Sequence, residues 1–221
     1  MNLEMVAFDV AGTVLHDDGL VITAFKKAFA TSQPELWPNH SAEWTQYALD
    51  TMGESKIHVF LKLLGDDGKA RAANLAFEAA YLDQITDIGA KPIDGAEALF
   101  KYLRGKGVAV ALTTGFSRST LDTILEHLRW KDLIDISVTP GEAGLGRPHP
   151  DMLNMAVKTL GITNPSEVVV CGDTSADMQA AVAFGAGQII GVLTGAHKEQ
   201  ALRAAGATLV VNSVADLMTL I

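Results

Sequence analysis

The chain has 221 residues, 48% hydrophobic and 19% charged, enough for one sizeable core with or without a small second domain. Its formal net charge of −9 argues against a nucleic-acid partner. No apolar run is long enough to span a membrane, and the first residues, MNLE, do not resemble a signal peptide. The single cysteine, Cys171, excludes an internal disulfide and follows three valines, as a buried thiol would. We therefore expect a cytoplasmic enzyme.

The predicted elements change character twice along the chain. A short apolar strand at residues 5–8 is followed, from about residue 17 to 89, by apolar residues at helical spacing. Helices and strands then alternate. The expected strands are 108–112, 134–138, 167–170, 188–192 and 208–211. One expected helix ends near residue 105, and the others span 117–128, 150–160, 176–184, 198–204 and 214–220.

This alternation predicts parallel strands joined by helical crossovers, hence an α/β, Rossmann-like, doubly wound sheet. The helical segment is then an insertion after the first strand. We expect a core domain of residues 1–16 and 89–221 and a helical cap domain of residues 17–88. The connections near 15–20 and 85–92 would act as hinges.

The end of the first predicted strand carries the most informative residues. Residues 8–13 read FDVAGT, so that Asp9 follows the strand and Ala11 stands two positions later. Open α/β folds bind ligands at this edge of the sheet, where an aspartate is placed to act as a nucleophile. The segment resembles the DxDGT motif that opens the haloacid dehalogenase (HAD) superfamily. In that motif the first aspartate is the nucleophile and the second protonates the leaving oxygen.

Ala11 replaces the second aspartate, and this variant of the motif resembles the phosphonatase branch, that of phosphonoacetaldehyde hydrolase. The resemblance implies an aspartyl-phosphate intermediate on Asp9, with Ala11, Gly12 and Thr13 close to the substrate. Positioned acid catalysis is typically worth roughly 10²- to 10⁴-fold, and an alanine cannot supply it. The motif therefore favours a reaction in which no ester oxygen is protonated from this position.

Two later segments offer groups that bind a phosphoryl oxygen. The strand at 108–112 runs into TTGFSR, which places Thr114, Gly115 and Phe116 between a strand end and a helix N-terminus. Such turns also serve for capping alone. Arg147 lies in GRPHP, where most HAD phosphatases carry lysine and the phosphonatase branch carries arginine. The resemblance makes Arg147 a catalytic cation with a bidentate grip; the alternative is a solvated surface arginine.

Residues 168–177, VVVCGDTSAD, end a buried strand in two carboxylates, Asp173 and Asp177. Carboxylates at a strand end suit a hard cation. The resemblance implies Mg²⁺ held by Asp9, Asp173 and the backbone carbonyl of Ala11, with Asp177 orienting this ligand set. The alternative for Asp177 is a helix cap.

In phosphonatases a cap lysine forms a Schiff base with the aldehyde, and residues 52–57, MGESKI, resemble that segment. Lys56 is the Schiff-base candidate, with Gly53 beside the substrate. The alternative is a specificity loop like that of β-phosphoglucomutase-like enzymes, in which the basic residue pairs with a distal anionic group.

Other positions depart from the phosphonatase pattern. This chain has Gly19 or Leu20, Phe116 and Val59 where phosphonatases have a cysteine, a tyrosine and a histidine. His58 is one residue out of register, which on a helix is a rotation of about 100°, so we expect it to face elsewhere.

The remaining histidines carry less weight. His16 lies beside the first hinge and is a candidate to face the cleft. We interpret the others, His40, His127, His149 and His197, as surface or capping residues.

Three functions follow from these patterns. The first is a Mg²⁺-dependent phosphonatase-like hydrolase of a small phosphonate, and the second is a phosphatase for small esters whose leaving groups need no acid. The third, a weakly catalytic binding protein, is disfavoured because the motif residues are all intact. Related enzymes often dimerise, which leaves a homodimer open for this chain.

Overall fold

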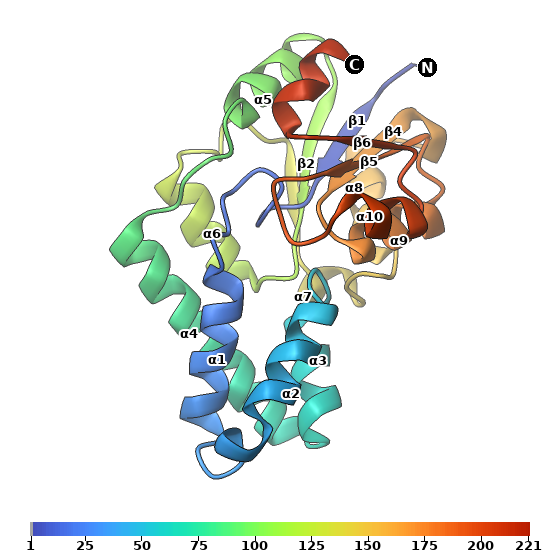
Figure 1. Cartoon of the computed structure of the whole chain (residues 1–221). Coiled ribbons are helices and arrows are strands. Elements are labelled where there is room, and N and C mark those ends of the chain that lie inside the picture. Colours follow the sequence, from blue (N-terminus) through green and yellow to red (C-terminus); the bar gives the residue numbers. More distant parts are fainter. Residues whose placement is uncertain (1) are drawn as a thin grey trace.

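A six-stranded parallel sheet forms the centre of the molecule in the computed structural model, which describes residues 2–221 (Figure 1). Its order is β3-β2-β1-β4-β5-β6. The strands are β1 (Met5–Phe8), β2 (Ala109–Thr113), β3 (Ile136–Val138), β4 (Val168–Gly172), β5 (Gln188–Val192) and β6 (Leu209–Val211). Because the chain starts at the centre and winds outward in both directions, this is the predicted doubly wound sheet.

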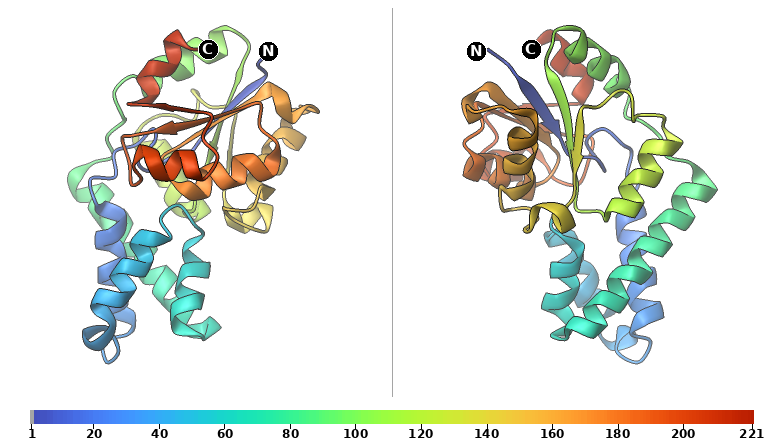
Figure 2. Two further views of the ribbon diagram at one scale, coloured as in Figure 1. Left: turned by 45° about the vertical axis from the view of Figure 1, so that its right-hand side comes forward. Right: turned by 180° about the vertical axis from the view of Figure 1, so that it is seen from behind.

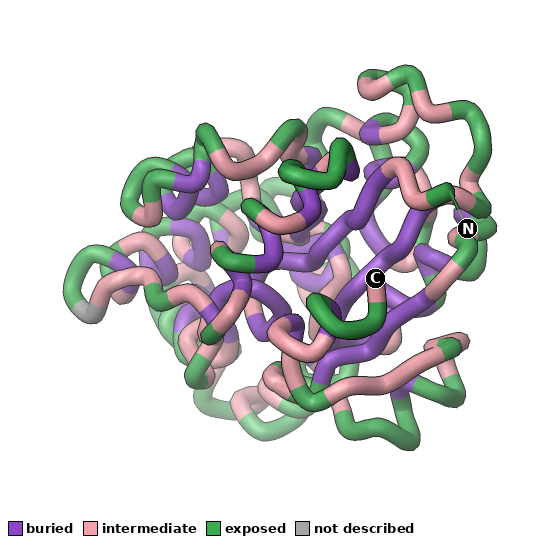
Figure 3. Tube along the Cα trace, turned by 90° about the horizontal axis from the view of Figure 1, so that it is seen from above, coloured by how far each residue is buried: buried purple, intermediate pink, exposed green. Residues whose placement is uncertain are grey.

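Alternate residues of the central strands pack into two hydrophobic clusters, one on each face. Phe8 and its neighbours in register, Leu112 and Cys171, belong to one cluster, whereas Ala7 and Val170 belong to the other. Strands that are covered on both faces are apolar throughout, and the sequence of β4, VVVCG, fits this rule. Figure 3 shows this buried centre, and the Cys171 thiol lies within it, as predicted.

Helices cover both faces of the sheet (Figure 2). One cluster includes residues of α5 (Ala96–Gly105), α6 (Arg118–His127) and the 3₁₀ helix η2 (Val214–Thr219); the other includes residues of α8 (Asp151–Leu160), α9 (Ser175–Phe184) and α10 (Glu199–Ala204). Two short elements, α7 (Pro140–Ala143) and η1 (Pro165–Glu167), complete the connections. Within residues 2–221, no helix has both the length and the apolar character that a membrane crossing requires.

The last predicted α-helix, at residues 214–220, is instead the 3₁₀ helix η2. Its start is fixed by a capping box between Ser213 and Asp216, and its buried residues, Val214 and Leu217, are three positions apart. That spacing matches the three residues per turn of a 3₁₀ helix, which keeps both side chains on the core.

Between β1 and α5 the chain forms the helical block, namely α1 (Leu20–Ser32), α2 (Trp37–Asp50), α3 (Lys56–Leu64) and α4 (Asp67–Ile88). The block lies beyond the carboxyl ends of the strands (Figures 1 and 2). Aromatic rings fill its interior. The Phe25 ring centroid lies 4.8 Å from that of Phe77 and 5.0 Å from that of Phe60. The helical character predicted for this segment is therefore confirmed.

Candidate active site

A cavity of about 620 Å³ lies where the carboxyl ends of the central strands face the helical block. Asp9 follows β1, Thr114 follows β2 and Asp173 follows β4, so residues far apart in sequence meet at one sheet edge. The predicted site residues that line the cavity are Asp9, Ala11, Gly53, Lys56, Thr114, Gly115, Phe116, Arg147 and Asp173. Gly12, Thr13 and Asp177 are not among the lining residues, but each is adjacent to one of them: Gly12 and Thr13 to Asp173, and Asp177 to Arg147.

Arg147 joins two of the carboxylates. Its Nη1 lies 2.7 Å from Oδ1 of Asp9 and also contacts Oδ1 of Asp177. The Arg147 side chain is only 4% exposed, which rules out a solvated surface arginine. Its Nε has no hydrogen-bond partner within residues 2–221. A buried donor without a partner is costly, so this guanidinium has capacity for a further acceptor.

Asp173 is fully buried and held by two donors. The Thr13 hydroxyl donates to Oδ1 at 2.9 Å, and the Ala196 N–H donates to Oδ2 at 2.8 Å. Even so, burial and the neighbouring Asp9 charge raise the pKa of Asp173 to about 7. Asp173 therefore binds a proton more readily than an isolated aspartate does.

A divalent cation fits this cluster. One ligand atom each from Asp9, Asp173 and Asp177 lie within 4.8 Å of one another, and all three residues are buried. Carboxylate oxygens are the ligands that small hard cations prefer. These three carboxylates face the single guanidinium of Arg147, a balance of charge that also suits a cation.

Asp177 has a second structural role, as the alternative interpretation predicted. Its Oδ2 accepts hydrogen bonds from the N–H and the hydroxyl of Thr174, at 3.0 and 2.6 Å, in a capping box at the start of α9. The Thr174 hydroxyl accepts in turn from the Asp177 N–H. The capping box thereby fixes Asp177 while its other oxygen faces Arg147.

The loop before α3 contacts the core with almost no clearance. A Cβ on Gly115 would lie 2.9 Å from the backbone oxygen of Glu54, and a Cβ on Gly53 would overlap the Thr174 side chain. Gly53 also has a φ of 88°, which only glycine adopts readily. These two glycines allow the helical block and the strand ends to approach closely.

Lys56, the first residue of α3, lies directly behind this contact. Its side chain is buried, with Nζ 5.6 Å from the centroid of the Phe25 ring and 3.3 Å from the Glu54 carbonyl oxygen, to which it donates. Burial and the Arg147 charge lower the pKa of Lys56 to about 8, although Asp9, Asp17 and Glu78 oppose the shift. A substantial fraction of the amine is therefore neutral near pH 8.

Glu78 of α4 links the helical block to the core. Its Oε1 accepts from the N–H of Ser117, at 3.2 Å, and its Oε2 from the Ser117 hydroxyl, at 2.9 Å. The Thr120 hydroxyl also donates to Oε2. A side chain of the block thus caps the core helix α6, which follows the Thr114 segment.

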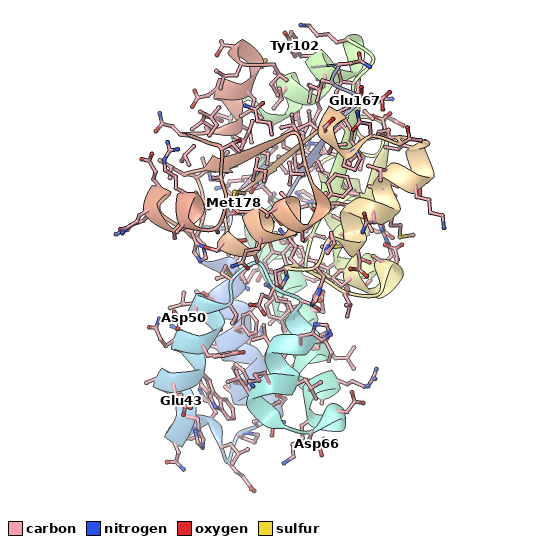
Figure 4. All side chains as sticks on the ribbon, turned by 90° about the vertical axis from the view of Figure 1, so that its right-hand side faces the viewer. Glu43, Asp50, Asp66, Tyr102, Glu167 and Met178 are labelled. Carbon is pink, nitrogen blue, oxygen red and sulfur yellow. The ribbon has the colours of Figure 1, made fainter. Side chains whose placement is uncertain are left out.

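The lining of the cavity also includes residues that the sequence analysis did not propose as site residues, among them Asp17, Asp50 and His197. His197 is in part the predicted capping residue, because its Nδ1 accepts from the Ser175 N–H, at 2.8 Å, at the start of α9. Asp50 ends α2 beside the core (Figure 4). All three occupy loops or helix ends, where no periodic pattern marks them.

The other histidines of interest lie away from the cavity. His16 is not among the residues that line it; its Nδ1 lies 3.9 Å from Oδ1 of Asp18. His58 is exposed on α3, as its register predicts.

Comparison with known proteins identifies the family. The family described as haloacid dehalogenase-like hydrolase matches residues 3–185. The chain belongs to the haloacid dehalogenase-like hydrolases. It is 28% identical to a phosphonoacetaldehyde hydrolase of Bacteroides fragilis, over all of this chain and 96% of the relative. A bifunctional riboflavin kinase/FMN phosphatase of Arabidopsis thaliana is 26% identical over 81% of this chain and 46% of its own length.

A solved structure has the same fold. It is described as a phosphonoacetaldehyde hydrolase-like protein from Oleispira antarctica, and it superimposes with a TM-score of 0.84 over 100% of this chain and 91% of the other, at 20% identity. The predicted HAD fold and hydrolase class are thus confirmed, and the phosphatase and phosphonatase families both supply relatives.

Proposed function

We propose that this HAD hydrolase is a Mg²⁺-dependent phosphonatase that cleaves the carbon–phosphorus bond of phosphonoacetaldehyde or a close analogue. The observation that carries the proposal is the buried amine of Lys56, which lines the same cavity as Asp9 and Arg147 where Ala11 offers no acid. In this view residues 17–88 are a cap domain on a core of residues 1–16 and 89–221. Identity of 28% to a phosphonoacetaldehyde hydrolase supports it.

The phosphoryl group would bind at the strand ends. The Arg147 guanidinium and the Thr114 hydroxyl would hold its oxygens, assisted by the backbone beside Gly115. The Asp9 carboxylate would attack phosphorus in line with the bond to carbon. Mg²⁺, held by Asp9, Asp173 and the Ala11 carbonyl with Asp177 supporting them, would neutralise charge between nucleophile and phosphonate.

Lys56 would activate the organic part. Its neutral amine attacks the aldehyde carbon, water leaves and an iminium ion remains. When Asp9 attacks phosphorus, the electrons of the P–C bond move into the iminium and form an enamine. The enamine then takes up a proton at carbon, and water hydrolyses the resulting iminium, which releases the aldehyde product and Lys56. A second water hydrolyses the aspartyl phosphate. No ester oxygen needs a proton in this sequence, which agrees with an alanine at position 11.

The deciding experiment is reduction with borohydride in the presence of phosphonoacetaldehyde. We expect a covalent adduct on Lys56, located by mass spectrometry, and none in the Lys56→Arg variant, which keeps the positive charge. Asp9→Asn should abolish phosphate release. Absence of an adduct on the wild-type enzyme would refute the imine mechanism.

A second candidate is a phosphatase for small esters with good leaving groups, favoured by the similarity to an FMN phosphatase. In that case Lys56 would only pair with an anionic group of the substrate. Fast hydrolysis of an aryl phosphate without any Lys56 adduct identifies this alternative, since aryl oxides leave without a proton.

A further inference from the structure

We propose that Asp17, at the junction of the core and the helical block, is a catalytic residue that carries a proton for Lys56. Its carboxylate takes the proton that Lys56 must lose before it attacks the aldehyde, and returns that proton to the oxygen that leaves as water. The inference rests on the imine chemistry proposed above. It supplies an acid–base group to a cavity in which Ala11 provides none.

The first argument is position. Asp17 precedes α1 and Lys56 is the first residue of α3, yet both line the same cavity. Oδ1 of Asp17 accepts from the Val21 N–H at 3.0 Å, which anchors the carboxylate at the start of α1. Within residues 2–221, no side chain donates a hydrogen bond to Asp17. The carboxylate is therefore both fixed and available.

The other carboxylates around Lys56 are already engaged. Oδ1 of Asp9 lies 2.7 Å from Nη1 of Arg147, and the proposed chemistry uses Asp9 as the nucleophile. Both oxygens of Glu78 accept hydrogen bonds from the core helix α6. Among the three acidic residues whose charges raise the pKa of Lys56, Asp17 is thus the one whose carboxylate has no side-chain donor within residues 2–221. Glu54 also interacts with the Lys56 charge, but it is not among the residues that line the cavity.

The second argument is the charge environment. Arg147, Asp9, Asp17 and Glu78 act on the Lys56 amine, and Lys56 and the adjacent Asp18 act on Asp17. Burial raises the pKa of Asp17 above its ordinary value of 3.8, whereas it lowers the pKa of Lys56 to about 8. The two groups are closer in proton affinity than in water, which makes transfer between them less costly.

The step balances without another reactant. The Lys56 ammonium gives one proton to the Asp17 carboxylate, and the resulting amine forms a C–N bond to the aldehyde carbon. A proton then moves from nitrogen to the former aldehyde oxygen, which gives a neutral carbinolamine. Asp17 donates its proton to that hydroxyl as the C–O bond breaks, so that water leaves. The products are the iminium ion, water and the Asp17 carboxylate.

The test isolates imine formation in an Asp9→Asn background, where the P–C bond stays intact. Phosphonoacetaldehyde is mixed with enzyme, borohydride is added after timed intervals, and the Lys56 adduct is quantified by intact mass. We expect Asp17→Asn to slow adduct formation by roughly 10²-fold or more. Asparagine still accepts the Val21 N–H, so α1 keeps its start. Asp17→Glu restores a carboxylate and should recover part of the rate.

Asp83→Asn is the control, because it removes a charge from the same helical block at a side chain that is 65% exposed, pairs with Lys27 and does not line the cavity. We expect its adduct to form at the parent rate. An Asp17→Asn rate equal to that of the parent, or no recovery in Asp17→Glu when both variants melt as the parent does, overturns the assignment of Asp17. If the parent itself gives no adduct, the imine mechanism fails and this inference with it.

Discussion

The backbone oxygen of Glu54 lies 2.9 Å from the point where a Cβ on Gly115 would stand, so the helical block meets the core where no side chain fits. Lys56 follows two residues later. The placement of its amine in the cavity therefore depends on this contact.

Gly115→Ala should push the loop before α3 away from the core. We expect the rate of Lys56 adduct formation to fall by about an order of magnitude or more, because small misplacements of reacting groups are costly. Thermal unfolding should change little. The control is Gly141→Ala, where nothing lies within 4 Å of the added Cβ. Equal rates in the two variants would show that the contact does not position the amine.

Glu78→Ala should destabilise the protein. It leaves the buried Thr120 hydroxyl and the partly buried donors of Ser117 without their acceptor, and an unsatisfied buried group costs about 1–3 kcal/mol. The free energy of unfolding is measured by urea denaturation. Asp83→Ala, on the same helix, removes only the exposed pair with Lys27 and should cost about 0–1 kcal/mol. Similar losses in both variants would contradict the linking role of Glu78.

Adduct formation should depend on pH through Lys56. In the Asp17→Asn variant no carboxylate at position 17 takes the proton from Lys56, so the rate should follow the fraction of neutral amine. It should rise as pH increases towards 8 and level off above it, because the pKa of Lys56 is about 8 and loss of the Asp17 charge can only lower it. A lysine with an ordinary pKa would show the rise near 10 instead. Initial rates of adduct formation between pH 6 and 10.5 distinguish the two profiles.

Arg147→Lys should lower kcat/KM for the phosphonate on the order of 10²-fold, by analogy with the loss of one preorganised donor. Lysine keeps the charge but replaces a planar fork that contacts both Asp9 and Asp177. Arg118→Lys, in a partly exposed network on α6, serves as the control. Wild-type kinetics in the Arg147 variant would show that charge alone suffices.

Mg²⁺ should raise the melting temperature, because a cation that binds only the folded state stabilises it. Asp173→Asn should remove most of this shift, whereas Asp122→Asn, which alters a largely exposed carboxylate, should leave it intact. Titration of the metal-free protein, followed by differential scanning calorimetry, measures the effect. An equal shift in the Asp173 variant would exclude that residue as a ligand.

The strand-end residues were predictable because they follow apolar runs directly. Once β1, β2 and β4 are recognised as parallel, Asp9, Thr114 and Asp173 must share one edge of the sheet. Only the resemblance of a short motif pointed to Lys56, since its place over that edge is set by how the loop before α3 packs against Gly115.

Asp17 and His197 could not be assigned to the cavity from sequence. Asp17 belongs to a turn before α1, and His197 belongs to the loop after β5, so neither lies on a periodic face. The structure confirms the helix cap predicted for Asp177, because one of its oxygens caps α9. Its other oxygen contacts Arg147, and its part in a metal site stays a prediction. A local pattern does not reveal such shared use of one carboxylate.

The close packing of Gly53 and Glu54 against the core has a consequence for substrate selectivity. If a bulky substrate displaced this loop, the Lys56 amine would be displaced with it, so such a molecule would bind without reacting. The contact would then limit the size of the substrates that react. The enzyme would then cleave phosphonates with short carbon chains and would not cleave larger phosphonates, even those that carry an aldehyde.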